Sequence, residues 1–244
     1  MLLLLAAATA TTVATGLGAI PVFFAGPSGA AALRRPLWGL AAGTMLVASI
    51  AGLLIPAGQQ GSALDLILGG LAGVAFLVIA RTMLGSRQRR GPLRTSAERS
   101  SILVFATLLV HSLPEGFAMG TAYASDTEGL ALFVIVAIAV QNIPEGTSVA
   151  LPMAEAGYSR SRQFWAAVAS SAPQPPGALI AFLAVDQVRS LLPLSLAFAG
   201  GAMLSLVLAE MLPRAFDRGI TRGPALGFAA GALAMLALSS ALGV

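Results

Sequence analysis

The chain has 244 residues, of which 57% are hydrophobic and only 10% are charged, and its mean hydropathy is +0.87. A soluble domain carries about 25% charged residues, so this chain has too few charged groups to cover a water-facing surface. The composition therefore excludes a soluble globular protein and a disordered chain. The lack of cysteine excludes a disulfide scaffold and any thiolate metal site. We predict a single all-α polytopic membrane domain over residues 1–244.

Eight runs of about 20 mostly apolar residues are each long enough to cross a bilayer as a helix. Gly, Pro or charged residues bound them, and they lack the alternation typical of barrel strands. The runs cover residues 1–24, 37–57, 63–84, 101–123, 129–153, 164–185, 191–212 and 223–244. We expect the first to be a retained helix rather than a cleaved signal peptide, because it is long and has no positive segment before it.

The arginines sort by the connection in which they lie. Thirteen of the 14 fall in odd-numbered connections, and only Arg189 falls in an even one. Because positively charged connections stay in the cytoplasm, the odd ones, including the basic loop 85–100, are predicted inside and both termini outside. Arg81 is expected to snorkel from a helix end. The arginines do not cluster on a solvated domain, so the pI near 11.0 does not indicate nucleic-acid binding.

Few ionisable or amide side chains remain within the predicted spans, and such groups usually mark a site or a pathway in a membrane protein. They are His111, Glu115, Gln141, Asn142, Glu145, Gln174 and Glu210. Two segments that contain most of them, HSLPEG at 111–116 and QNIPEG at 141–146, share the pattern polar-polar-aliphatic-Pro-Glu-Gly. The repeat lies on consecutive helices that cross in opposite directions, which is typical of the inverted repeats of transporters. Gly116 and Gly146 are expected to let neighbouring helices approach closely.

Residues 111 and 115, and likewise 141 and 145, are four apart and so share a helix face. His111, Glu115, Gln141 and Glu145 would offer an imidazole, two carboxylates and an amide oxygen. This mixed nitrogen and oxygen set suits Zn²⁺, and also Fe²⁺ or Mn²⁺. We therefore predict a divalent metal site without thiolates, whose metal binding weakens at acid pH.

These two segments resemble the Zrt/Irt-like protein (ZIP) family of divalent metal transporters, most closely its bacterial GufA-like branch. Supporting matches are GAIP at 18–21, AGTML at 42–46 with LIP at 54–56, and AGGAML at 199–204 leading to EMLP at 210–213. The resemblance implies eight helices in a 3+2+3 arrangement with inverted repeats. It also implies metal uptake by alternating access, and often a homodimer. Helices one, four, five and six would then slide against the others, with Gly39, Gly43, Gly200 and Gly201 available for close contacts.

By resemblance, His111, Glu115, Gln141 and Glu145 form the primary transport site. A second adjacent metal in some members would use the positions of Ser112, Asn142 and Gln174. Here a serine follows the histidine, and Gln174 stands where a glutamate is often found. We therefore expect a single-metal site, in which Gln174 does not bind the metal and at most interacts weakly with its ligands. Glu210 aligns with an exit position but has Ala209 beside it in place of the usual histidine, which implies a weak exit site.

The favoured interpretation is a transporter in the cell (inner) membrane that moves a divalent metal into the cytoplasm, with lipid as its surroundings and no cofactor. Zinc is favoured, with Cd²⁺, Fe²⁺ and Mn²⁺ as alternatives. The same carboxylates could instead couple protons or carry a small solute, and a structural scaffold is a further alternative. An intramembrane metalloprotease is excluded, because a His-Glu-x-x-His motif needs two histidines and the chain has one. Asp65, Asp126 and Glu128 would either attract cations at the entrance or be solvated loop charges.

Overall fold

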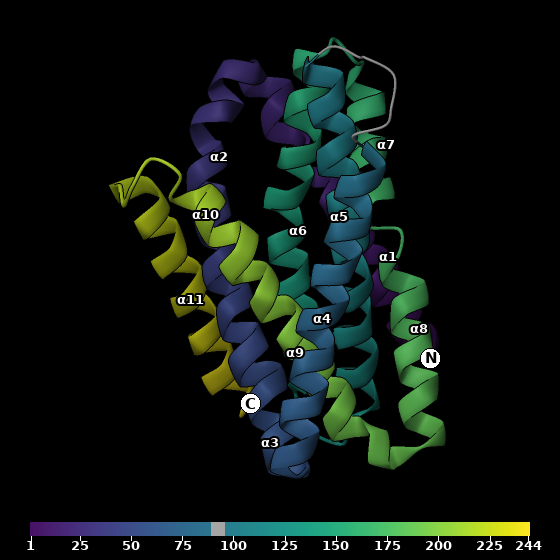
Figure 1. Ribbon diagram of the computed structural model, residues 1–244. Coiled ribbons are helices and arrows are strands. Elements are labelled where there is room, and N and C mark those ends of the chain that lie inside the picture. Colours follow the sequence, from purple (N-terminus) through teal and green to yellow (C-terminus); the bar gives the residue numbers. More distant parts are fainter. Residues whose placement is uncertain (89–95) are drawn as a thin grey trace.

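The computed structural model is a bundle of helices whose axes are roughly aligned (Figure 1). It describes residues 1–88 and 96–244, with the side chains of 84–88, 96–100 and 103 left aside. In these two stretches the regular structure is helical, without strands, which confirms the all-α prediction. Much of the predicted basic loop 85–100, including Arg89, Arg90 and Arg94, lies outside the described residues.

The helices follow one another up and down the bundle. The first half of the chain comprises α1 (Leu2–Leu17), α2 (Ile20–Ser49), the π-helical segment η1 (Ile50–Leu54), α3 (Ile55–Gln60) and α4 (Ala63–Gln88). The two long helices α5 (Ser96–Ala124) and α6 (Leu130–Glu155) follow. The remainder comprises α7 (Arg160–Ser170), α8 (Gln174–Gln187), η2 (Arg189–Leu191), α9 (Leu192–Leu206), the π-helical η3 (Val207–Met211), α10 (Leu212–Ala215) and α11 (Arg222–Leu242).

The predicted first span, 1–24, is wrong at its C-terminal boundary. Helix α1 ends at Leu17, and α2 begins at Ile20 and contains a kink at Gly26, where φ is 66° and ψ is 177°. Glycine adopts this backbone conformation without a Cβ clash. Arg34 and Arg35 therefore lie on a helix rather than in a loop. Helical structure then extends through η1 and α3 to Gln60, past the predicted end at residue 57.

The predicted span 164–185 is broken in the structure. Helix α7 ends at Ser170, and α8 begins at Gln174. Pro173, Pro175 and Pro176 lack the N–H that a continuous helix needs, so the chain cannot pass through this segment as one α-helix. The break brings Gln174 to the first turn of α8, where its side chain is fully buried.

Six helical segments in the described part of the chain are long and apolar enough to cross a membrane. They are Ile20–Gln60, Ala63–Met83, Leu130–Glu155, Arg160–Gln187, Arg189–Ala215 and Arg222–Leu242. Helix α1 is a shorter apolar helix of 16 residues, and α5 is 29 residues long. The chain is thus a multi-pass membrane protein, whereas eight crossings and a 3+2+3 arrangement remain predictions.

The described arginines gather at one end of the bundle. Figure 1 shows the bend of α2 and the α6–α7 and α10–α11 connections in its upper part, and the α3–α4, α5–α6 and α8–α9 connections at its lower end. Arg35 at the upper end pairs with Asp217 at 2.8 Å, and Arg189 at the lower end lies 3.8 Å from Asp126. We call the upper end the arginine end.

Glycines bring helices together in pairs. A Cβ on Gly116 would meet the Gln174 backbone of α8, and a Cβ on Gly146 would meet the Thr15 carbonyl of α1. The expected close approach at both Pro-Glu-Gly segments is therefore confirmed. Gly39 and Gly43 face α11, and Gly201 faces Gly70 of α4. These glycines hold α2, α4, α9 and α11 together, so the prediction that they lie at a sliding interface with α1, α5, α6 and α8 is wrong.

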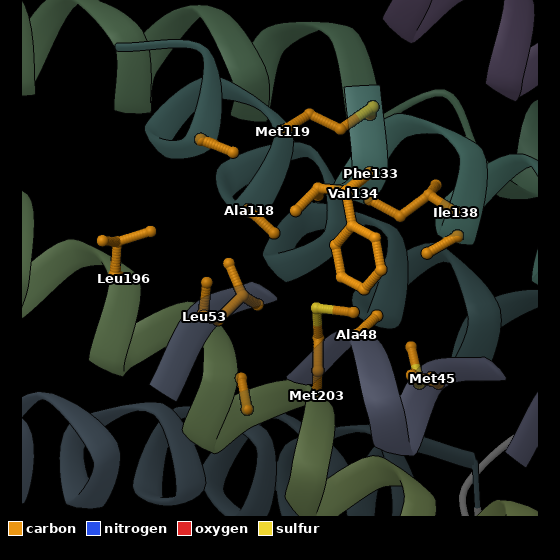
Figure 2. Close-up of a cluster of buried hydrophobic side chains, with 14 of the residues drawn as sticks. Met45, Ala48, Leu53, Ala118, Met119, Phe133, Val134, Ile138, Leu196 and Met203 are labelled. Carbon is orange, nitrogen blue, oxygen red and sulfur yellow. The ribbon is translucent and has the colours of Figure 1, made fainter. Parts of the chain in front are cut away.

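An apolar layer separates these two groups of helices (Figure 2). Its buried side chains come from both groups: Met45, Ala48 and Leu53 of α2 and η1, Leu196 and Met203 of α9, Ala118 and Met119 of α5, and Phe133, Val134 and Ile138 of α6. Burial of this apolar surface within the protein gives close van der Waals packing, which drives helix association in lipid. The layer itself is held by packing rather than by hydrogen bonds.

Candidate metal site

The two repeated segments place their glutamates inside the bundle. Glu115 on α5 and Glu145 on α6 are both fully buried. Each follows a proline inside its helix, at 114 and 144, and each precedes a glycine at a close helix crossing. The Pro-Glu-Gly sequence therefore frees a backbone carbonyl and narrows the helix spacing beside each carboxylate.

Two amide side chains bind Glu115. Gln141 Nε2 donates to Glu115 Oε1 at 2.8 Å, and Gln174 Nε2 donates to Glu115 Oε2 at 2.8 Å. Gln174 reaches this position because α8 begins at that residue, against Gly116. Both oxygens of this carboxylate thus accept a hydrogen bond, which offsets much of its desolvation.

Glu145 has no such partners. Both of its carboxylate oxygens are buried without a hydrogen-bond donor in the described structure, and so is Gln141 Oε1. The Glu145 carboxylate lies close enough to that of Glu115 for the two charges to interact. Two adjacent buried carboxylates repel each other unless a positive charge lies between them. The pair therefore has the chemistry of a cation or proton site.

His111 lies closer to the arginine end than Glu115 and Glu145 do, and its ring nitrogen faces Glu210. His111 Nε2 is 3.1 Å from Glu210 Oε1, and both side chains are buried. Glu210 also pairs with Arg81 Nε at 3.0 Å and with Arg214 Nη2 at 2.9 Å. Arg81 thus binds Glu210 while its side chain remains 38% exposed, and its snorkelling stays a prediction.

The four predicted primary ligands are thus only partly brought together. Glu115, Gln141 and Glu145 lie side by side, while His111 pairs with Glu210. Among the side chains that the structure describes, no group of three His, Cys, Asp or Glu residues surrounds a common point. The metal ligands that the sequence predicts are therefore divided, in this conformation, between the group of Glu115, Gln141 and Glu145 and the neighbouring His111–Glu210 pair.

The residues of the expected second site have separate roles. Ser112 Oγ donates to the carbonyls of Leu108 and Ser170, at 2.9 and 3.0 Å, so backbone groups bind it. Asn142 Oδ1 accepts from Gln174 Nε2 at 3.2 Å, while Asn142 Nδ2 donates to the Thr11 carbonyl at 2.7 Å. Gln174 is therefore a central hydrogen-bonding residue that contacts Glu115 directly, rather than a weak neighbour.

A row of hydroxyl groups on α1 was not predicted from the sequence. Thr11 Oγ1 donates to Gln174 Oε1 at 2.9 Å, and Thr15 Oγ1 donates to Ser171 Oγ at 2.8 Å. Thr11 and Thr15 are four residues apart in α1, so they lie on one helix face. That spacing was the available signal, because buried hydroxyls in a membrane helix need partners on a neighbouring helix.

A cavity of about 440 Å³ opens at the arginine end, and Glu210 lines it. Its other lining residues come from α2, α4, α5, α6 and the η3–α10 segment: Arg34, Trp38, Arg81, Val104, Ser148, Ala209, Pro213, Arg214 and Asp217. At the opposite end Asp65 accepts from Ser62 N and Oγ at 2.9 and 2.7 Å, and Asp126 is highly exposed. These contacts favour ordinary surface charge over a built entrance site.

The fold and site together define a class of protein. A multi-pass helical bundle whose interior holds two adjacent carboxylates, beside a helix broken by prolines, has the features of a membrane transporter with a polar site in its interior.

Comparison with known proteins assigns the family within that class. Residues 82–239 match the model of the ZIP zinc transporter family, and the chain belongs to this family. It is 34% identical to the zinc transporter GufA of Myxococcus xanthus, over 94% of this chain and 95% of that protein. It is 32% identical to the zinc transporter ZupT of Corynebacterium aurimucosum, over 84% of this chain and 83% of that one. Members of the family are transporters and not enzymes, as the sequence predicted.

A longer plant relative also matches. The chain is 36% identical, over 85% of its length, to an Arabidopsis thaliana protein whose name assigns it provisionally as a zinc transporter. The match covers 33% of that relative. The substrate and partners of the whole chain are therefore argued below from its own residues.

Proposed function

We propose that this protein carries a divalent metal, with zinc as the favoured substrate, across the inner membrane into the cytoplasm by alternating access. The transported ion would bind between Glu115 and Glu145, with Gln141 Oε1 and His111 Nε2 as further ligands. Carboxylate oxygen and imidazole nitrogen ligands suit Zn²⁺ and also Cd²⁺, Fe²⁺ or Mn²⁺. Uptake into the cytoplasm would agree with the gathering of the described arginines at one end of the bundle.

One observation carries this proposal. Glu145 Oε1 and Oε2 and Gln141 Oε1 are all buried without a hydrogen bond among the described residues. Each of these atoms can supply a lone pair, and buried polar atoms rarely lack a partner. A set of unpartnered acceptors in the interior is the arrangement that a cation would complete.

The same atoms support a path toward the arginine end. His111 is four residues before Glu115, about one helical turn closer to that end. Its Nε2 atom lies against Glu210, which lines the cavity. The ion would pass from the two glutamates to His111, then to Glu210, and then into the cavity. His111 would leave Glu210 when it joins the glutamates around the metal.

Alternating access would move one helix group against the other. The layer between the groups is apolar and contains Met45, Met119 and Met203, whose flexible side chains repack easily (Figure 2). Within the described interior, the polar contact between the groups is the one from His111 to Glu210. A movement along this layer would therefore break few directional bonds. Eight crossings in a 3+2+3 arrangement, and a homodimer, remain part of this proposal.

A single bound ion is favoured over two. Gln174 Nε2 points toward Glu115 Oε2 and Asn142 Oδ1, so an N–H donor lies where a second cation would need to contact the same oxygens. A neutral amide also brings no negative charge to offset a second divalent ion. We therefore infer that Gln174 fills the place of a second metal in this chain.

Metal uptake into proteoliposomes tests the proposal. Wild type should take up Zn²⁺ in a saturable manner, with Cd²⁺, Fe²⁺ and Mn²⁺ measured in parallel. Glu145→Ala and His111→Ala should lose most of this flux, and Glu155→Ala should retain it, because Glu155 is an exposed carboxylate at the end of the same helix. Equal flux in wild type and Glu145→Ala would contradict the assignment.

Proton or small-solute transport is the second candidate, favoured by the closeness of the Glu115 and Glu145 carboxyl groups. A single proton between the two groups would remove their repulsion as a metal does. The His111→Ala variant separates the candidates, because a proton pathway through the glutamates would continue without this imidazole. Proton flux that is independent of metal and unaffected by His111→Ala would favour this alternative.

A further inference from the structure

The cavity at the arginine end carries more positive than negative charge. Arg34, Arg81 and Arg214 line it, together with the carboxylates of Glu210 and Asp217. Asp217 pairs with a further guanidinium, that of Arg35, at 2.8 Å. Counting Arg35, the described residues place four guanidinium groups against two carboxylates around one cavity.

The guanidinium groups keep free hydrogen-bond donors. Arg81 uses its Nε toward Glu210, and Arg214 uses one Nη. Each guanidinium has five N–H donors, so most of them remain available. Arg34 forms no hydrogen bond or ion pair with any described residue, and its side chain is exposed. Arg214 stacks on Trp38 with its Cζ 4.8 Å from the ring centroid, which holds that guanidinium in place.

A positively charged cavity is an unfavourable passage for a divalent cation unless an anion offsets the charge. Guanidinium groups bind phosphate oxygens with paired N–H donors, and several around one cavity favour a dianion. The cavity volume of about 440 Å³ leaves ample room for a small oxyanion beside Glu210.

We propose that this cavity binds a free phosphate-type oxyanion through Arg34, Arg81 and Arg214. The anion competes with Glu210 for Arg81 and Arg214, and so leaves the Glu210 carboxylate free to accept the cation from His111. The anion site rests on the cavity alone, whereas its role in metal release rests on the proposed function.

Trp38 provides a direct measurement of anion binding. The chain has two tryptophans, and the other, Trp165, is 62% exposed, so Trp165→Phe leaves a single reporter in the cavity wall. Inorganic phosphate is titrated into this variant, as full-length protein in an uncharged detergent without metal, against chloride at equal ionic strength. A saturable change in Trp38 fluorescence with phosphate, and none with chloride, is expected.

Two arginine variants test the assignment of the site. In the Trp165→Phe background, Arg34→Gln should weaken phosphate binding by about tenfold, the usual loss when one charged hydrogen bond is removed. Arg162→Gln removes an exposed arginine at the same end that does not line the cavity, and should leave phosphate binding unchanged. Arg34 has no contact to lose, so the fold should tolerate its substitution.

Three results would overturn the proposal: no saturable response to phosphate, equal phosphate binding in Arg34→Gln and its background, or a response only to nanodiscs of phosphatidylglycerol, which would assign the arginines to lipid. The Glu145→Ala variant keeps this inference separate from metal transport. It removes the proposed metal ligand but should retain phosphate binding, so failure of one proposal is distinguishable from failure of the other.

Discussion

Glu145→Gln should make the metal-free protein more stable while it removes metal binding. The Glu145 carboxylate is fully buried, both of its oxygens lack a donor, and it lies beside Glu115. An unsatisfied buried polar group costs about 1–3 kcal/mol. The amide of glutamine has nearly the same shape, carries no charge and can donate to Glu115. We therefore expect the free energy of unfolding to rise by about 1–3 kcal/mol.

Differential scanning fluorimetry with and without zinc measures both effects. For a chain of this size each kcal/mol corresponds to about 2–4 °C in Tm. Zinc at 100 times its Kd should stabilise wild type by about 2.7 kcal/mol, and should stabilise Glu145→Gln much less, because an anionic ligand is lost. Glu155→Gln makes the same chemical change at an exposed position of α6 and should match wild type in both measurements.

A lower metal-free Tm in Glu145→Gln would contradict this prediction, because the carboxylate would then have stabilising partners that are not among the described residues. A zinc-dependent rise in Tm that survives the substitution would contradict it too. A parallel change in Glu155→Gln would mean that the loss of charge, rather than the position, causes the effect.

Three further predictions follow from the same contacts. Gln174→Glu replaces a side chain that donates two hydrogen bonds with a buried charge, so the metal-free protein should lose about 3–5 kcal/mol in chemical unfolding. Zinc should restore part of this loss, and an unchanged metal-free stability would contradict the role assigned to Gln174. Gly146→Ala should cost at least about 1–3 kcal/mol and reduce uptake, because its Cβ would meet the Thr15 carbonyl. Gly70→Ala, whose Cβ has no neighbour closer than 4.0 Å, should be tolerated, and equal losses in the two variants would argue against a close crossing at Gly146. Zinc affinity, measured by isothermal titration, should fall between about pH 7 and pH 5, because the imidazole and carboxylates must lose their protons to bind a metal; a constant affinity would exclude them as ligands.

The duplicated Pro-Glu-Gly segment carried most of what the sequence predicted correctly. It identified Glu115 and Glu145 as a pair on facing helices, and it identified the glycines that allow close approach. Both predictions depend on local features, namely the i, i+4 spacing and the lack of a Cβ. Such features belong to each helix by itself, so they can be read from the sequence without knowing how the helices pack.

The sequence did not predict the contacts between distant segments. Arg81 reaches Glu210 from another helix, and Gln174 reaches Glu115 because α8 begins at mid-depth. A hydropathy pattern reports which groups are apolar, but not which polar groups meet. The break before Gln174 did have a local signal in its three prolines, since a helix cannot continue through them. The partners of Gln174 on α1 had only the weak signal of threonine spacing.

The location of bound zinc tests the central claim most directly. Anomalous diffraction at the zinc edge, from crystals grown with the metal, should show one ion per chain between the Glu115 and Glu145 carboxylates. Its oxygen ligands should lie at about 2.0–2.2 Å, with His111 turned from Glu210 toward the ion. Two fully occupied ions bridged by the glutamates would contradict the single-metal site. A zinc ion bound elsewhere, with none at these carboxylates, would contradict the account as a whole.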